Sequence, residues 1–152
     1  MSAVLLRTGT DADADAVAEL YLRARDHAVP QIPPSVHSQD EVRDWIRGLL
    51  QGQQVWLAAA GDGMLLGLMV LTGDWVQELY VDPAHTSNGY GAQLLELAKQ
   101  RRPEGLQLWT FQSNLRAQQF YERHGFAVEE RTDGSRNEER APDLRYVWRP
   151  VR

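Results

Sequence analysis

The sequence predicts an α/β (α+β) protein, because strand-like and helical patterns alternate around three consecutive strands. Two strand-like runs, Gln54 to Ala60 and Met64 to Leu71, are joined by Gly61-Asp62-Gly63, a strong hairpin turn signal. A third run, Val76 to Val81, follows after a short connection, so the three strands should form an antiparallel meander. With 43% hydrophobic and 24% charged residues, the 152-residue chain suits a single domain over residues 1–152.

The N-terminal third predicts one short strand and two helices. Val4-Leu5-Leu6 is a short apolar run, and from Asp13 to Arg25 apolar residues recur at three and four. The proline-rich stretch Val29 to Ser35 ends the first helix. A second helix should start after a Ser38 or Asp40 cap. We expect its buried stripe to consist of Val42, Trp45, Ile46 and Leu49.

The remaining elements follow a helix that spans Gln93 to Arg101 and ends at Pro103-Glu104-Gly105. Leu106 to Phe111 is strand-like, and Asn114 can cap a helix that Gly125 closes. The last strands are expected to begin at Phe126 and to span Asp143 to Arg149, with a polar loop over residues 132–140 between them.

The strand Val76 to Val81 leads through a loop of small residues directly into a helix. Gly89 and Gly91 can adopt positive φ angles and let an anion approach the backbone closely. The free N–H groups of the first helical turn and the helix dipole also favour negative charge. This arrangement predicts a phosphate or pyrophosphate site.

The loop resembles the acetyl-CoA pyrophosphate loop of the GCN5-related N-acetyltransferases, the GNAT superfamily, whose pattern is [QR]-x-x-G-x-[GA]. Thr86 stands where the pattern has Gln or Arg, and Asn88 stands where a basic residue is common. These two departures remove side-chain charge and leave the backbone donors. The resemblance implies that acetyl-CoA is bound by Thr86, Ser87, Asn88, Gly89, Tyr90, Gly91 and Ala92.

A second stretch, Asn114 to Phe126, resembles the GNAT pattern N-x-x-A-x-x-[FL]-Y-x-x-x-G-F. Two motifs in the right order are far more specific than either alone, and the order of elements extends the resemblance to nearly the whole chain. It implies the GNAT fold, a mixed and mostly antiparallel sheet of six to seven strands with helices on both faces.

The resemblance also implies roles for individual residues. Asn114 and Ala117 would lie beside the pantetheine arm, and the backbone of Leu79, Tyr80 and Val81 would pair with its amides as an added strand does. Tyr121 would protonate the departing thiolate, a role that suits a phenol in a dry cleft. The alternative for Tyr121 is a core aromatic side chain.

Direct acetyl transfer needs an unprotonated amine, and Glu78 is the candidate base or amine anchor on the central strand. A carboxylate bonded to a neighbouring hydroxyl or arginine is the alternative for Glu78. The backbone N–H of Leu79 would stabilise the oxyanion, as the resemblance implies.

The resemblance places the acceptor between two segments, His27 to His37 and Asp133 to Asp143. In the second segment Asn137, Glu138 and Glu139 could hold a cation. A solvated charged loop is the alternative.

Composition excludes several other classes of function. A net charge of −5 does not favour nucleic acid, and the absence of cysteine excludes a disulfide framework and an acyl-cysteine intermediate. Four scattered histidines predict no metal site. Met1 to Arg7 has no signal-peptide pattern and no apolar run is long enough to span a membrane, so we expect a cytoplasmic protein without a membrane partner.

The leading hypothesis is an acetyl-CoA-dependent N-acetyltransferase that acts on a small-molecule amine by direct transfer in a ternary complex. The alternatives are a protein lysine or N-terminal acetyltransferase, a non-catalytic acyl-CoA-binding regulatory domain, and last a nucleotide-binding module. Many GNAT proteins dimerise, so the resemblance also implies a homodimer.

Overall fold

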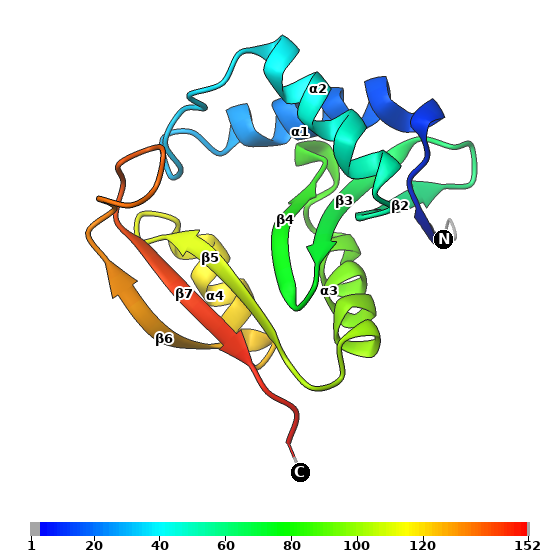
Figure 1. Cartoon of the computed structure of the whole chain (residues 1–152). Coiled ribbons are helices and arrows are strands. Elements are labelled where there is room, and N and C mark those ends of the chain that lie inside the picture. The colour runs from blue at the N-terminus through cyan, green and yellow to red at the C-terminus, as the bar shows by residue number, and fades with distance from the viewer. Residues whose placement is uncertain (1–3, 152) are drawn as a thin grey trace.

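The computed structural model describes residues 4–151, which form a seven-stranded sheet in the order β1-β2-β3-β4-β5-β7-β6 (Figure 1). The first three residues of the segment considered for a signal peptide lie outside the described part. All neighbouring strands are antiparallel except β4 and β5. The expected mixed, mostly antiparallel sheet is therefore confirmed.

The elements have the following bounds. The strands are β1 (Val4–Thr8), β2 (Val55–Ala60), β3 (Leu65–Thr72), β4 (Trp75–Val81), β5 (Leu106–Phe111), β6 (Ala127–Thr132) and β7 (Asp143–Trp148). The helices are α1 (Ala14–His27), α2 (Gln39–Gln51), α3 (Tyr90–Arg101) and α4 (Leu115–Arg123), with short 3₁₀ turns η1 (Asp11–Asp13) and η2 (Pro83–His85).

Two apolar cores hold the helices on opposite faces of the sheet. Val17, Leu20 and Ile46 of α1 and α2 pack with buried residues of β2 and β3. On the other face, Leu94 of α3 and Tyr146 of β7 belong to a second core, against which α4 also packs. Figure 1 shows α1 and α2 above the meander and α3 behind it.

The second helix begins as expected, but the face that it buries differs slightly from the predicted one. The Ser38 side chain accepts a hydrogen bond from the Glu41 N–H, and the Glu41 carboxylate accepts one from the Ser38 N–H, which completes a capping box. The expectation that Trp45 is buried was wrong, because its side chain is 40% exposed. The Trp45 ring stands edge-on against the Tyr21 ring, with 5.3 Å between the ring centroids. Trp45 therefore lies at the edge of the contact between α2 and α1.

The sheet opens between β4 and β5. These parallel strands pair only at Trp75 and Gln107, while β4 remains paired with β3 along its length. A register shift between Val70 and Leu71 leaves one extra residue on β4, and such bulges bend a strand. Strands β4 and β5 therefore diverge, and Figure 1 shows the gap between them.

Candidate active site

The gap presents backbone donors of β4 that have no strand partner. The Asp82 N–H donates to Leu66 O on β3, and successive N–H groups of a strand point to opposite sides. The N–H groups of Leu79 and Val81 consequently point toward β5, beyond the point where β5 pairs. An extended ligand with amide groups can pair with them as an added strand.

The loop after β4 ends in a left-handed glycine at the start of α3. Gly89 has φ +81° and gives no side-chain cap, so the N–H groups of Tyr90, Gly91 and Ala92 have no acceptor within the helix. Thr86, Ser87 and Asn88 before it are exposed to solvent. The loop therefore supplies several backbone donors and the positive end of a helix dipole to an anion.

Gly91 has a different backbone conformation from the one expected. It lies inside the first turn of α3, which starts three residues earlier than Gln93, and its φ is not positive. A Cβ placed on Gly91 would lie 3.4 Å from Val81 and 3.5 Å from Phe120. Both are ordinary van der Waals distances, so Gly91 packs beside β4 and α4, and an alanine would also fit there.

These features fit the acetyl-CoA site that the sequence predicts. The helix start and its loop would hold the pyrophosphate, and the Leu79 and Val81 backbone would hold the pantetheine amides. A Cβ on Gly89 would meet no atom within 4 Å, so the surface above the loop is open to a ligand.

We expect Gly89→Ala to weaken both folding and CoA binding. An alanine at this positive φ costs about 1–2 kcal/mol, and relaxation of the strain would move the N–H donors of α3. Gly48→Ala is the matched control, since Gly48 lies within α2 with nothing near its Cβ, and should stabilise by about 0.5–1 kcal/mol. Urea unfolding and a CoA titration measure both effects. Unchanged CoA affinity in Gly89→Ala would contradict the assignment of the anion loop.

Glu78 lies on β4 at the gap, on the face that carries α1. Its side chain points to the same side as that of Tyr80, whose ring packs edge-on against Tyr21 at 5.4 Å. The pKa of Glu78 is raised to about 7, mainly because the carboxyl group is buried. The Arg25 charge opposes this rise, and the Glu139 carboxylate contributes to it. A carboxyl group with this pKa can accept and return a proton near neutral pH.

Tyr121 lies on α4, across the gap from Glu78. Its ring packs against Phe126 and Tyr146 in the core beneath the C-terminal strands. Burial raises the pKa of Tyr121 above the usual tyrosine range, and the nearby Glu78 charge raises it further. The hydroxyl therefore stays protonated at neutral pH and is available as a donor.

Asn114 and Ala117 lie at the start of the same helix. The Asn114 side chain caps α4 by accepting a hydrogen bond from the Ala117 N–H at 3.2 Å, as its position predicts. The Asn114 Oδ1 atom is thus engaged with backbone in this structure. Gly125, with φ +87°, follows the end of the helix as expected.

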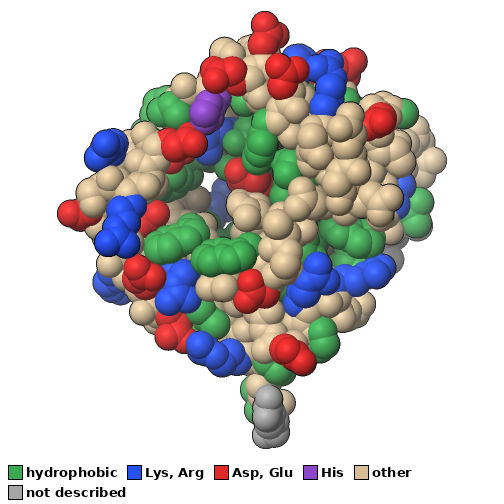
Figure 2. All heavy atoms as spheres, in the orientation of Figure 1, with side chains coloured by type: hydrophobic (Ala, Val, Ile, Leu, Met, Phe, Trp, Pro, Cys, Tyr) green, Lys and Arg blue, Asp and Glu red, His purple; other side chains and the backbone are tan. Residues whose placement is uncertain are grey.

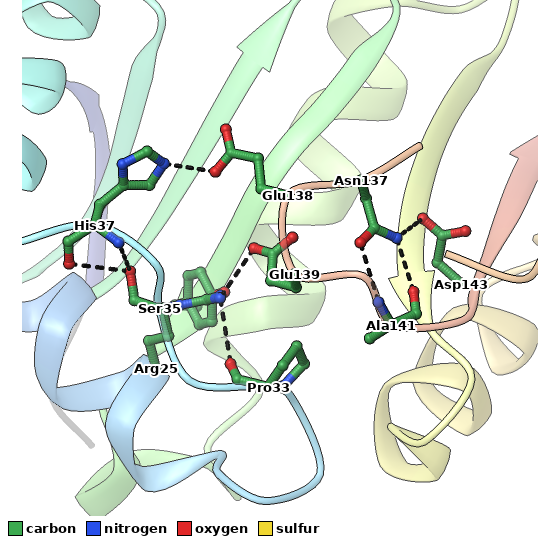
Figure 3. A network of polar contacts seen from close by, with 10 residues as sticks. Arg25, Pro33, Ser35, His37, Asn137, Glu138, Glu139, Ala141 and Asp143 are labelled. Carbon is green, nitrogen blue, oxygen red and sulfur yellow. Dashed lines mark hydrogen bonds and ion pairs between the residues drawn. The ribbon is translucent and has the colours of Figure 1, made fainter. Parts of the chain in front are cut away.

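The two predicted acceptor segments lie side by side, although about a hundred residues separate them (Figure 3). His37 from the α1–α2 connection contacts Glu138 of the β6–β7 loop, with 2.5 Å between Nε2 and Oε2. Ser113 Oγ donates to Gln31 O and fixes the same connection to the end of β5. Figure 2 shows a hollow next to these segments, with charged and hydrophobic side chains around it.

Asn137 serves its own loop instead of facing the gap. Its amide nitrogen donates to Ala141 O at 2.7 Å and to Asp143 Oδ2 at 3.1 Å, and its oxygen accepts from the Ala141 N–H. Asn137 thereby shapes the loop that carries Glu138 and Glu139 (Figure 3). Of the three residues in this segment expected to hold a cation, Glu138 is exposed, and Asn137 and Glu139 are half-buried.

The sequence reasoning missed Arg25, which is only 7% exposed. Its guanidinium contacts Tyr80 Oη and Glu139 Oε2, both at 3.3 Å, and it lies close enough to Glu78 to oppose the rise in its pKa. One signal in the sequence was available, since Arg25 follows Tyr21 by four residues on the apolar stripe of α1. A charged residue on a buried stripe needs a partner.

Comparison with known families agrees with this arrangement. Residues 51–128, just over half of the chain, match the profile of the acetyltransferase (GNAT) domain. The chain belongs to the GNAT family of acetyltransferases. At the level of the family, membership confirms the predictions of an acyltransferase and of acetyl-CoA as its cosubstrate.

A curated relative of this GNAT chain is the peptidyl-lysine N-acetyltransferase YjaB of Salmonella typhimurium strain LT2. The two sequences are 30% identical over 93 residues, which cover 61% of this chain and 63% of the relative. The aligned part therefore spans somewhat less than two thirds of the relative's length.

Solved structures share the GNAT fold over almost the whole chain. The solution structure of apo YjaB from Escherichia coli has a TM-score of 0.78 and 24% identity, covering 96% of this chain and 97% of that one. The PaiA N-acetyltransferase of Thermoplasma acidophilum, crystallised with coenzyme A, has a TM-score of 0.71 and 20% identity, covering 97% and 99%. Across residues 4–151, this GNAT chain has no helix with the length and apolarity that a membrane crossing requires.

Proposed function

We propose that the protein transfers an acetyl group from acetyl-CoA to a primary alkyl amine by direct attack in a ternary complex. The observation that carries the proposal is the gap between β4 and β5, which combines Glu78 with the backbone donors of Leu79 and Val81. One edge of β4 thus offers a base of suitable pKa beside an extended binding surface.

Bound acetyl-CoA would supply an activated acetyl thioester. Residues of the chain would deprotonate the amine, stabilise the oxyanion and protonate the thiolate. Glu78 accepts a proton from the alkylammonium group, directly or through one water, because its pKa of about 7 leaves it ionised at slightly basic pH. The N–H of Leu79 donates to the carbonyl oxygen that gains negative charge. Tyr121, protonated because burial raises its pKa, donates its hydroxyl proton to the departing sulfur.

The names of the relatives favour a peptide lysine as the acceptor, since YjaB of Salmonella typhimurium is called a peptidyl-lysine N-acetyltransferase. A small-molecule amine is the second candidate, and one structural observation favours it. Contacts of Glu138 and Glu139 with His37 and Arg25 join the two predicted acceptor segments, and such a bridge leaves less room for a bulky acceptor. Both acceptors present the same alkylamine to Glu78.

The proposal is tested by thiol release from acetyl-CoA over lysine peptides, N-terminal peptides, polyamines, aminoglycosides and amino acids, beside a CoA-binding titration. Mass spectrometry of each product would show one added acetyl group on nitrogen. We expect turnover on one class of amine. Tight CoA binding without thiol release on any amine would overturn the proposed activity and leave the binding site in place.

A further inference from the structure

Arg25 is a buried cation whose hydrogen bonds are long and incomplete. Nη1 lies 3.3 Å from Tyr80 Oη, and Nη2 lies 3.3 Å from Glu139 Oε2 and 3.4 Å from Pro33 O. The Nε atom is buried and finds no hydrogen-bond partner among residues 4–151. A buried guanidinium normally needs close, well-aligned acceptors to offset its loss of hydration.

Other arginines of the chain are better paired although they are more exposed. Arg7 forms a bidentate pair with Asp13 at 2.8 and 2.9 Å, and Arg23 lies 2.9 Å from Asp82. Arg25 is more buried than Arg7 and Arg23, and its contact with a carboxylate is longer than theirs. Among residues 4–151, the carboxylate that pairs with Arg25 is Glu139, which lies in a loop 114 residues away and contacts it through a single oxygen (Figure 3).

The position of Arg25 places this incomplete pairing beside the reacting centre. The Arg25 charge acts on Glu78, and its guanidinium contacts Tyr80, two residues along the same strand. Glu139 also lines a cavity of about 370 Å³ whose walls include Trp109 and Phe111. Trp109 is 42% exposed, so this cavity next to Glu139 is open to solvent.

We propose that Arg25 is the recognition site for a carboxylate on the acceptor, and that Glu139 occupies the place of that carboxylate until the acceptor displaces it. The inference rests on the proposed amine acetylation and specifies the class of acceptor. The acceptor carries an amine for Glu78 and, within the same molecule, a carboxylate that forms the bidentate pair that Arg25 lacks. A free diamino acid and a lysine with an acidic neighbour in a peptide both offer this chemistry.

The first test compares L-lysine with cadaverine, which is the same amine without the carboxylate. A parallel arm compares the peptides Ala-Lys-Ala-Glu and Ala-Lys-Ala-Gln, both amidated at the C-terminus. We expect kcat/KM to be about 10- to 100-fold higher for the carboxylate-bearing member of one pair, since a hydrogen-bonded ion pair with a buried charge is worth that much. The arm that shows the difference identifies the source of the carboxylate. Equal values within both pairs would overturn the proposal.

Two variants separate recognition from support of the fold. Arg25→Lys keeps the charge but loses the planar fork, and should remove most of the preference for L-lysine over cadaverine. Glu139→Gln removes the competing carboxylate, and should lower KM for the carboxylate acceptor while KM for cadaverine stays the same. A merely structural ion pair would instead make Glu139→Gln raise KM for both amines. Arg43→Gln, which breaks the exposed contact with Asp15, is the matched control for loss of an arginine.

A binding measurement keeps this inference distinct from the proposed activity. In ¹⁵N-labelled protein, the Arg25 Nε–H signal, assigned by its loss in Arg25→Lys, is followed during titration with 5-aminovalerate and with cadaverine. A saturable shift with 5-aminovalerate alone supports carboxylate recognition even if no amine is acetylated. The absence of a shift with 5-aminovalerate would overturn it even in an active enzyme.

Discussion

Glu78→Gln should lower kcat/KM by about 10²- to 10⁴-fold at pH 8, the usual contribution of a general base. Glutamine has nearly the same shape and can still accept a hydrogen bond, but it cannot take the proton of an alkylammonium group. The loss should be largest for acceptors with a high amine pKa, because these are the most fully protonated at pH 8.

The pH profile gives the more specific test of Glu78. Its pKa is about 7, so the base is protonated at pH 6 and activity should rise with pH through a limb near pH 7. Glu78→Gln should lose that limb and keep only the one that belongs to the amine. Steady-state rates between pH 5.5 and 9.5 measure it, with Glu129→Gln on the exposed β6 edge as control.

Stability provides a second readout for the same variant. A folded pKa above the unfolded value of about 4.5 means that the folded state binds the extra proton. The stability from neutral Glu78 is present below pH 4.5 and is lost as pH rises through 7. Glu78→Gln should therefore be more stable than the parent at pH 8 and similar to it at pH 4.5, in urea unfolding. A variant that lost activity and stability together at pH 8 would point to a structural carboxylate.

Tyr121→Phe should lower kcat by about 10²-fold or more while the CoA dissociation constant stays unchanged. Phenylalanine keeps the ring contacts with Phe126 and Tyr146 and removes only the acidic hydroxyl. The effect should fall on chemistry, because the proton is needed when the carbon–sulfur bond breaks. Single-turnover kinetics with a saturating amine isolate this step.

Tyr146→Phe is the matched control for Tyr121→Phe. Tyr146 is a buried tyrosine of the same core, and its hydroxyl donates to Glu122 at 2.7 Å. Loss of the Tyr146 hydroxyl should lower the free energy of unfolding and leave kcat nearly unchanged. Full turnover in Tyr121→Phe would exclude Tyr121 as the acid.

The features that were predicted correctly from the sequence are those that depend on interactions between neighbouring residues. The left-handed Gly89, the Ser38 capping box and the Asn114 cap each depend on a few neighbouring residues, and each is present in the structure. The mixed, mostly antiparallel sheet was predicted from the resemblance to a family, since parallel pairing leaves little local pattern.

The remaining features depend on partners that are distant in the sequence. Arg25 meets Glu139 across 114 residues, a contact that no periodicity encodes. Trp45 fits the apolar stripe of α2, and only the packing of that helix on Tyr21 shows that the ring lies at the rim. Gly91 was interpreted as a turn residue, whereas it lies in the first turn of α3 and its φ is not positive.

The two halves of the sheet are joined at two separate places, and one of them is the single pairing between β4 and β5. Backbone pairing joins the two halves of the sheet at Trp75 and Gln107. At the opposite rim, Glu139, Glu138 and Ser113 of one half contact Arg25, His37 and Gln31 of the other. The first junction is insensitive to most substitutions because it uses main-chain atoms, while each of these contacts at the second junction depends on at least one side chain. Under the proposed function, exchange of a few residues at the second junction would change the size of acceptor that is admitted, while the residues proposed to bind acetyl-CoA stay the same.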